Sequence, residues 1–211
     1  MKKFRLYILI ILIIILAQGC SKPGEDDFSK AHKMLSGLES YTTTAEIIIR
    51  GNKLVGSYIV KQHFKYPDRY RLETVSPDDK RGKITIYDGY GIWIYNPQIN
   101  QTYTMENFKE VEESGMFPGY FAKNLFSGEE AVYDIMRDGE AEYITIKVLI
   151  PGTNPYRKHQ ILYIDKEKMI PVKMEVLDSS GNTTITVYYR DFKYNEELDE
   201  DIFKRMVAES L

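Results

Sequence analysis

Three histidines and a single cysteine are the residues of this chain best suited to hold a metal ion or to act as a nucleophile. His32, His63 and His159 lie far apart, and none has a second ligand at the spacing of a metal-binding motif. The sequence contains no G-x-S-x-G motif and no glycine-rich phosphate loop. We therefore predict a protein without catalytic residues, metal ion or cofactor. The alternative is a catalytic pair of carboxylates among the many acidic residues.

The cysteine, Cys20, ends an N-terminal segment with the pattern of a secretion signal. Three positive charges in the first five residues precede an apolar run at 6–16. That run is shorter than the roughly 20 residues needed to span a membrane. Leu16–Cys20 resembles the cleavage site of a bacterial lipoprotein signal, although most such sites carry leucine where Ala17 stands. The resemblance implies removal of residues 1–19 and acylation of Cys20; the alternative is an ordinary secretion signal.

Charge and cysteine content limit the classes of partner. The 211 residues include 28 Lys and Arg against 31 Asp and Glu, a net charge of −3. Loss of Lys2, Lys3 and Arg5 with the signal leaves 25 against 31, a net charge of −6. An acidic chain without a basic run argues against nucleic acid and against electrostatic docking on anionic lipid. We expect an extracytoplasmic protein without a disulfide, attached to the membrane through lipid on Cys20.

Hydrophobic spacing predicts one domain at 28–211, preceded by a polar tether at 20–27. Apolar residues recur at helical spacing over 27–39 and predict an amphipathic helix. Alternation with period two follows, as is typical of antiparallel strands with one buried and one solvated face. Turn residues such as Asp88-Gly89 separate these runs. The alternating runs in the first half are 45–49, 58–64, 70–72, 84–86 and 92–94.

The second half returns to strands after a helical interval. Phe121, Leu125 and Phe126 predict a helix, and 127–130 predicts the start of another. The second helix would carry Ala131, Ile135 and Met136. Further strands are expected at 144–150, 157–165, 171–178 and 183–192, and a short helix at 200–209. We predict an α+β fold: a strongly curved antiparallel sheet of about 10–11 strands, a half β-barrel, covered on its concave face by helices.

Three segments together resemble the LolA/LolB-like lipoprotein-sorting superfamily. Phe64–Glu73 carries a P-D-x-Y-R-hydrophobic-E pattern, and Asp88–Pro97 carries D-G-x-x-x-W-x-Y-x-P. Ile164–Lys173 carries D-x-x-x-x-x-P-V-K and is followed by Tyr189–Phe192. Each segment is a weak signal, but the three in this order cover most of residues 28–205. The resemblance implies a half-barrel closed over by helices, the outline that hydrophobic periodicity predicts independently.

Within that superfamily, the chain is most similar to the GerS-like spore-germination lipoproteins of clostridia. The similarity implies a protein partner of a CwlD-like N-acetylmuramoyl-L-alanine amidase that processes spore cortex peptidoglycan. A partner that prefers the active conformation of the enzyme raises its population without doing chemistry. The alternatives are a membrane-anchored carrier of lipid or lipoprotein in the half-barrel cavity, a sensor of envelope stress or sporulation, and an unrecognised hydrolase.

Aromatic residues are the best candidates for contact with a partner. The chain has 17 tyrosines, and in one predicted strand Ile92 and Ile94 face one side while Trp93 and Tyr95 face the other. Aromatic side chains with polar tips suit an interface, because they are apolar yet tolerate water. The simpler interpretation is cross-strand pairing that stiffens the sheet. The candidate contact residues are Trp93, Tyr95, Tyr188 and Arg190.

Two further features concern partners. The connection at 105–120 is long for a compact domain, and such a segment can act as a hinge for exchange of elements in a homodimer. Acidic clusters at 110–113 and 196–201 are expected to be solvated loops and helix starts. The alternative for these clusters is contact with a basic partner surface.

Overall fold

The fold is one antiparallel sheet with two α-helices against it, among the residues that the computed structural model describes: 25–51, 55–106, 115–128 and 130–204. The predicted signal and Cys20 lie outside these residues. The helices are α2 (Glu25–Ser36) and α3 (Pro118–Ser127), with 3-10 turns η1 (Asp78–Lys80) and η3 (Glu200–Phe203). The strands are β1 (Ser40–Arg50), β2 (Val55–Lys65), β3 (Arg69–Ser76), β4 (Ile84–Tyr87), β5 (Gly91–Asn96), β6 (Gln101–Glu106), β7 (Ala131–Asp138), β8 (Ala141–Leu149), β9 (His159–Asp165), β10 (Ile170–Leu177) and β11 (Thr183–Tyr194).

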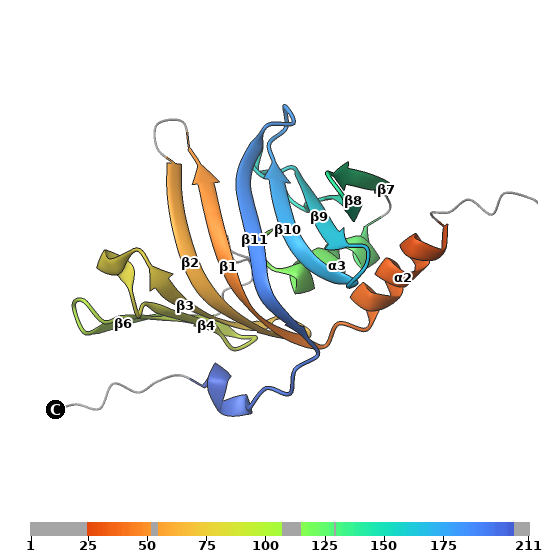
Figure 1. Cartoon of the computed structure of the whole chain (residues 1–211). Helices are drawn as coiled ribbons and strands as arrows, with labels where there is room; N and C mark the ends of the chain where they lie inside the picture. Colours follow the sequence, from red (N-terminus) through yellow and green to blue (C-terminus); the bar gives the residue numbers. More distant parts are fainter. Residues whose placement is uncertain (1–24, 52–54, 107–114, 129, 205–211) are drawn as a thin grey trace, which may run out of the picture.

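The sheet consists of two meanders joined in the middle. Its order is β6-β5-β4-β3-β2-β1-β11-β10-β9-β8-β7, so the first and last strands pair at the centre. The strands curve around one side, with α3 behind the centre of the sheet and α2 beside it (Figure 1). Strands β6 and β7 are the two edges, so the described sheet is open. The prediction of a curved antiparallel half-barrel with helices is confirmed in this outline.

Alternation along each strand divides the sheet into an inner face, which packs against the helices, and an outer face. On β1, the inner residues Tyr41, Ala45 and Ile47 are at most 4% exposed and belong to the main core. The intervening residues Thr42 and Glu46 are only partly buried, on the outer face. Burial of the inner side chains supplies the main driving force for this packing.

The closest approach of helix to sheet occurs at Gly119, in the first turn of α3. A Cβ atom built there would overlap the ring of Phe64 on β2, which is itself fully buried. Phe64 stacks on Tyr41 at 5.4 Å between ring centroids, and Phe117, just before α3, lies 4.6 Å from Tyr70. Only a residue without a side chain lets the helix backbone rest on this aromatic layer.

Polar side chains of the inner face bind the backbone just before α3. The amide of Gln160 donates to the Gly115 carbonyl at 3.1 Å, and the hydroxyl of Tyr189 donates to the Met116 carbonyl at 2.9 Å. Gln62 also donates to the Met116 carbonyl, at 3.4 Å. Both glutamines are fully buried. Buried carbonyl groups without a hydrogen-bond donor are energetically costly. β2, β9 and β11 therefore supply the donors that the backbone of Gly115 and Met116 needs.

The predicted helix carrying Ala131, Ile135 and Met136 is wrong, because these residues lie in β7. Residues 131 and 135 are four positions apart. This spacing places two residues on the same face of a helix and also on the same face of a strand. Along β7 partly buried and exposed residues alternate from Ala131 to Met136, and the strand pairs antiparallel with β8. The β-branched and aromatic residues Val132, Tyr133 and Ile135 favour the extended form.

The other helical predictions need smaller corrections. α2 begins at Glu25 rather than 27 and ends at Ser36 rather than 39, so its first turn lies inside the predicted tether. The helix predicted from Phe121, Leu125 and Phe126 is α3; the first two are buried and Phe126 is 44% exposed. The terminal helix is a 3-10 turn at Glu200–Phe203, and residues 205–209 lie outside the described part.

Substitution Gly119→Ala tests the close approach of α3. We expect destabilisation by about 1–3 kcal/mol, because a methyl group must displace the buried Phe64 ring. Urea denaturation of the full chain in detergent measures it. Gly115→Ala is the control, since its Cβ would meet the side chains of Gln160 at 3.4 Å and Val176 at 3.9 Å, both ordinary contact distances. Phe64→Leu should reduce the penalty in the double variant. Equal stability of the two alanine variants would contradict this packing.

Candidate protein-binding surface

The strand register places all four predicted contact residues on the outer face. Trp93 pairs with Ile86 on β4, and Ile86 pairs with Arg71 on β3. The same row continues through His63 to Thr42 on β1, and β1 also pairs Glu46 with Tyr188. Directly paired residues share a face of the sheet. Trp93 and Tyr188 nevertheless belong to strands five positions apart, about 24 Å at the usual strand spacing.

A ladder of aromatic and charged side chains crosses β9, β10 and β11 on this face. Lys173 on β10 has its ammonium 4.5 Å from the ring centre of Tyr163 and 6.0 Å from that of Tyr188. Glu175 accepts a hydrogen bond from the Tyr163 hydroxyl at 2.7 Å and pairs with Lys173 at 2.8 Å. Burial, followed by this bond to Glu175, raises the pKa of Tyr163, so the hydroxyl stays protonated and donates.

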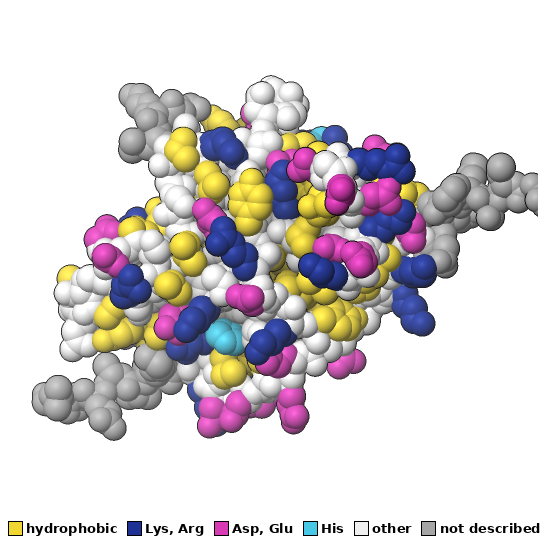
Figure 2. Space-filling view, in the orientation of Figure 1, with side chains coloured by type: hydrophobic (Ala, Val, Ile, Leu, Met, Phe, Trp, Pro, Cys, Tyr) yellow, Lys and Arg dark blue, Asp and Glu magenta, His cyan; other side chains and the backbone are white. Residues whose placement is uncertain are grey.

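These side chains adjoin a shallow groove of 250 Å³ that extends to the edge of the sheet. Its walls combine apolar and polar groups from five strands, β7 to β11. We call the surface around it the outer patch. The outer patch comprises Glu46, Met136, Tyr143, Tyr163, Val172, Lys173, Glu175, Tyr188 and Arg190. Figure 2 shows hydrophobic side chains on this side of the molecule interspersed with charges of both signs.

Tyr188 and Arg190 are the accessible members that the sequence predicted. Tyr188 is 39% exposed, and the Arg190 side chain is 67% exposed. The Arg190 guanidinium bonds Glu46 at 2.7 Å, and surface pairs of this kind contribute only about 0–1 kcal/mol. Arg190 can therefore exchange this partner for another at little cost. Tyrosine and arginine are the residue types that most often dominate binding energy in interfaces.

Trp93 and Tyr95 are less accessible than Tyr188 and Arg190. Trp93 is 5% exposed and packs with Ile84 and Ile86 in a small second cluster, against which Tyr95 is partly buried. The two rings stack at 6.5 Å between centroids. Both rings belong to β5, and across the sheet Trp93 pairs with Ile86 and Tyr95 with Ile84. Trp93 therefore offers little surface to a partner.

Sequence reasoning missed Tyr163 and Lys173, which line the same groove as Tyr188. Both lie at outward positions of alternating strands, so period two alone puts them on the outer face. The position of Lys173 between the two tyrosines requires the register of β9, β10 and β11, in which Tyr163 pairs with Lys173 and Lys173 with Tyr188. A bulge in β10 beside Pro171 shifts that register and cannot be read from the sequence.

The C-terminal segment after β11, residues 195–203, lies against the ends of β1, β2 and β3. Thr42 donates to Glu196 at 2.5 Å, and Glu200 pairs with Arg69 and Lys65. Phe203 is 3% exposed beneath the Arg69 guanidinium. The acidic cluster at 196–201 therefore makes contacts within the chain. The other cluster, 110–113, lies outside the described residues, as does the middle of the predicted hinge at 105–120, residues 107–114.

The described residues, 25–51, 55–106, 115–128 and 130–204, contain neither a metal-binding cluster nor a membrane-spanning helix. No group of three or more His, Cys, Asp or Glu side chains in these ranges is placed to hold a metal ion. No helix in the same ranges is long and apolar enough to cross a membrane.

The pKa of His63 is lowered, first by burial and then by the nearby Arg71 charge, which favours its neutral form.

Comparison with known proteins places the chain in a family context. A family model described as sporulation protein YdcC-like matches residues 1–203. The sporulation protein YdcC of Bacillus subtilis is 20% identical over 216 residues, which cover 96% of this chain. This chain spans only 60% of the length of that relative.

Solved structures give a closer match. The GerS lipoprotein in the complex with the CwlD amidase from Clostridioides difficile is 32% identical, with a TM-score of 0.51. The match covers 84% of this chain and 99% of the lipoprotein. A LolA superfamily protein from Nitrosomonas europaea is 14% identical, with a TM-score of 0.45 over 86% of this chain and 97% of its own. The predicted resemblance to GerS-like lipoproteins is confirmed.

The ion pairs of Glu200 predict how the C-terminal segment responds to acid. Hydrogen bonds from Arg69 and then Lys65 lower the pKa of Glu200 from 4.5 to about 2. Because the folded value is depressed, the favourable contribution is present above the unfolded pKa and is lost as pH falls from about 4.5 towards 2. Carboxyl NMR titration should give a midpoint near 2 for Glu200.

Arg69→Gln should move that midpoint back towards its usual value. Arg81→Gln is the matched control, because Arg81 pairs with Asp78 and not with Glu200. A Glu200 midpoint that is unaffected by Arg69→Gln would show that the segment is held in another way.

Proposed function

The chain belongs to the sporulation protein YdcC-like family, and from this premise we propose that it is a lipid-anchored, non-catalytic protein that binds and activates a cell-wall amidase. The enzyme would be an N-acetylmuramoyl-L-alanine amidase of the CwlD type, acting on spore cortex peptidoglycan. The protein would lie outside the cytoplasm, attached to the membrane through Cys20, and would be needed for cortex processing and germination.

One observation carries this proposal: the match to the GerS lipoprotein, whose structure is a complex with an amidase. At 32% identity over 99% of the lipoprotein, the two chains share the whole half-barrel rather than a single motif. The family description independently supports involvement in sporulation. Neither the family nor the matched lipoprotein is named as an enzyme, in agreement with a partner role.

We assign the contact with the amidase to the outer patch. The Tyr163–Glu175–Lys173 contacts fix the surroundings of Tyr188 before any partner arrives. A surface ordered in advance loses less conformational entropy on binding. The patch also combines exposed aromatic area with charges that can re-pair, the composition of an interface centre with a polar rim.

Activation would follow from binding linkage. If the patch binds the active conformation of the amidase more tightly than the inactive one, the complex shifts the enzyme towards activity. A tenfold rise in the population of a minor active state needs about 1.4 kcal/mol of differential binding. An interface centred on Tyr188 and Arg190 can supply that amount.

Alanine substitutions in the outer patch test the assignment. Tyr188→Ala and Arg190→Ala should each weaken amidase binding about tenfold or more, because aromatic and arginine contacts dominate interface energy. Calorimetry with the purified amidase of the same organism and the full chain in detergent measures the affinity. Amidase turnover at saturating protein reports activation in the same samples.

Two matched controls accompany these variants. Tyr156→Ala removes a tyrosine that is 62% exposed but lies in the loop between β8 and β9. Arg81→Ala removes an exposed, ion-paired arginine away from the patch. Both controls should bind the amidase as the unmodified chain does. If the patch variants bind equally well, the interface lies elsewhere.

Lipid attachment is tested separately at Cys20. Because Cys20 is the sole cysteine of the chain, metabolic labelling with an alkyne fatty acid reports on it directly. We expect the label and the membrane association to be lost in Cys20→Ser and retained in Ala17→Leu, which restores the usual residue of lipoprotein signals. Label that persists in Cys20→Ser would contradict acylation at this sulfur.

A carrier of lipid or lipoprotein is the second candidate function, and an inner-face pocket favours it. The pocket has a volume of 320 Å³ and apolar walls that include Ile47 and Leu72. Lys80, Lys83 and Arg157 line it as well, and no carboxylate is among its described lining residues. An acyl chain with an anionic head would fit this chemistry. The volume is at the lower end of ligand pockets, about 300–1,000 Å³, and fully buried Phe64 and Phe117 fill much of the inner face.

A homodimer formed by exchange of elements is also part of the proposal. Its hinge at 105–120 includes only residues 105–106 and 115–120 of the described chain. The outer patch lies on β1 and β7–β11, away from β6 where that segment begins. Exchange through this hinge would therefore leave the outer patch available to the amidase.

A further inference from the structure

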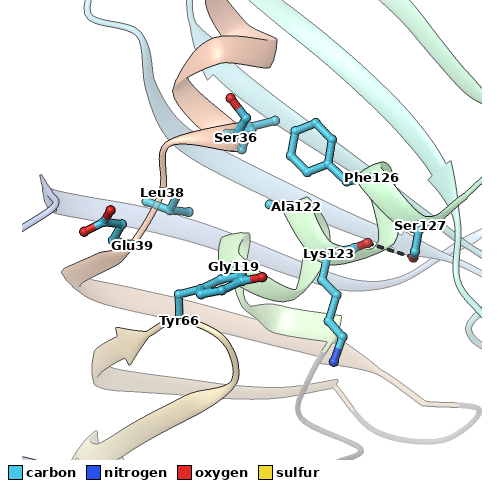
Figure 3. A pocket seen from close by; sticks show the side chains of 10 residues that line it. Ser36, Leu38, Glu39, Tyr66, Gly119, Ala122, Lys123, Phe126 and Ser127 are labelled. Carbon is cyan, nitrogen blue, oxygen red and sulfur yellow. Dashed lines mark hydrogen bonds between the residues drawn. The ribbon is translucent and has the colours of Figure 1, made fainter.

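A groove lies at the end of the half-barrel where α2 approaches α3. Its volume is 580 Å³, within the range of small-ligand sites, about 300–1,000 Å³. Leu38 and Ala122 lie between the two helical segments, while Tyr66 and Phe126 lie at opposite ends (Figure 3). This groove is separate from the outer patch, because the two share no lining residue.

The two aromatic side chains are accessible, unlike those of the core beneath them. Tyr66 is 63% exposed and Phe126 is 44% exposed, whereas Phe64 and Phe121 are fully buried. The Tyr66 ring lies beside Gly119 at the start of α3 (Figure 3). Two exposed rings along an apolar floor form flat platforms on which a ligand can stack.

The charged side chains that line the groove are not engaged in ion pairs with other described residues. Glu39 and Lys123 both line the groove, and neither forms an ion pair with another described residue. Ser36 and Ser127 donate their protons to the carbonyls of Lys33 and Lys123, at 3.0 and 2.8 Å. Their oxygens therefore remain as acceptors. The groove thus offers one anionic acceptor, one cationic donor and two hydroxyl acceptors.

We propose that this groove binds a glycan of N-acetylated sugars, the chemical class of the amidase substrate. This inference rests on the proposed function. Sugar rings present a C–H face that stacks on aromatic rings, while their hydroxyl and acetamido groups need both donors and acceptors. The Glu39 carboxylate and the Lys123 ammonium carry opposite charges. The groove therefore suits a neutral polyhydroxyl ligand better than a strongly charged one. The polar rim makes the groove a poor site for an acyl chain, whose desolvation of Glu39 and Lys123 would be unfavourable.

The position of the groove gives this binding a role. It lies on α2, α3 and the β2–β3 turn, whereas the outer patch lies on β1 and β7–β11. A protein that held the enzyme at one surface and a glycan at another would raise the effective concentration of substrate near the enzyme.

Calorimetric titration of the full chain with tri-N-acetylchitotriose tests the proposal, in a detergent without a sugar headgroup. We expect saturable binding in the millimolar range or tighter. Tyr66→Ala and Phe126→Ala should each weaken it about threefold to tenfold, the equivalent of one lost aromatic contact. Lys123→Gln should weaken it as well. Tyr156→Ala, which removes an equally exposed tyrosine outside the groove, should leave the affinity unchanged.

Three results would overturn the assignment: no saturable binding, equal binding by the groove variants, or equal binding of maltotriose, which lacks acetamido groups. Amidase binding measured on the same variants separates this inference from the proposed function. If the amidase binds and the sugar does not, only the glycan site fails. If the sugar binds with the predicted dependence on Tyr66 and the amidase does not, the glycan site stands and the partner role fails.

Discussion

The chain must pass once from one edge of its sheet to the other. The hydrogen bonds that the buried backbone of this connection needs determine how the rest of the molecule packs. β6 and β7 are consecutive strands at opposite edges, and the described part of the connection between them, beginning at residue 115, lies against the inner face. Its backbone at Gly115 and Met116 is buried there and takes hydrogen bonds from Gln62, Gln160 and Tyr189. Without these donors the buried carbonyls would each carry a desolvation cost of about 1–3 kcal/mol.

This crossing determines which surfaces remain for function. It brings Phe117 and α3 onto the aromatic layer of Phe64 and Tyr70, and so fills much of the space that a wide half-barrel would leave open. The described inner face carries a pocket of 320 Å³, and the outer patch and the groove at α2 and α3 are accessible. The architecture therefore favours recognition of partners at the surface over transport of cargo within.

The sequence predicted the sheet well because burial alternates regularly along most strands. The position of Gln62 beside Val60 and Phe64 was also apparent from period two, but its complete burial was not. That burial depends on Met116, 54 residues away, as an acceptor. β7 was mistaken for a helix because Ala131 and Ile135 share a face in either form. Only pairing with β8 decides between them.

The candidate site was predictable only in part, for a related reason. The exposure of Tyr188 and Arg190 agrees with their outward positions on β11. Trp93 has the same outward position but is covered within a cluster with Ile84 and Ile86. Alternation assigns a residue to a face, whereas the amount of surface it presents depends on neighbours from other strands.

Co-purification from sporulating cells, with the tagged full chain as bait, tests the central claim most directly. Mass spectrometry identifies proteins in the sample, and lipid extraction of the same sample measures bound acyl chains beyond those on Cys20. The account predicts a peptidoglycan amidase in near-stoichiometric yield, lost in the Tyr188→Ala, Arg190→Ala double variant, and no additional lipid. Stoichiometric acyl chains without an amidase would contradict it and identify the protein as a membrane-anchored carrier.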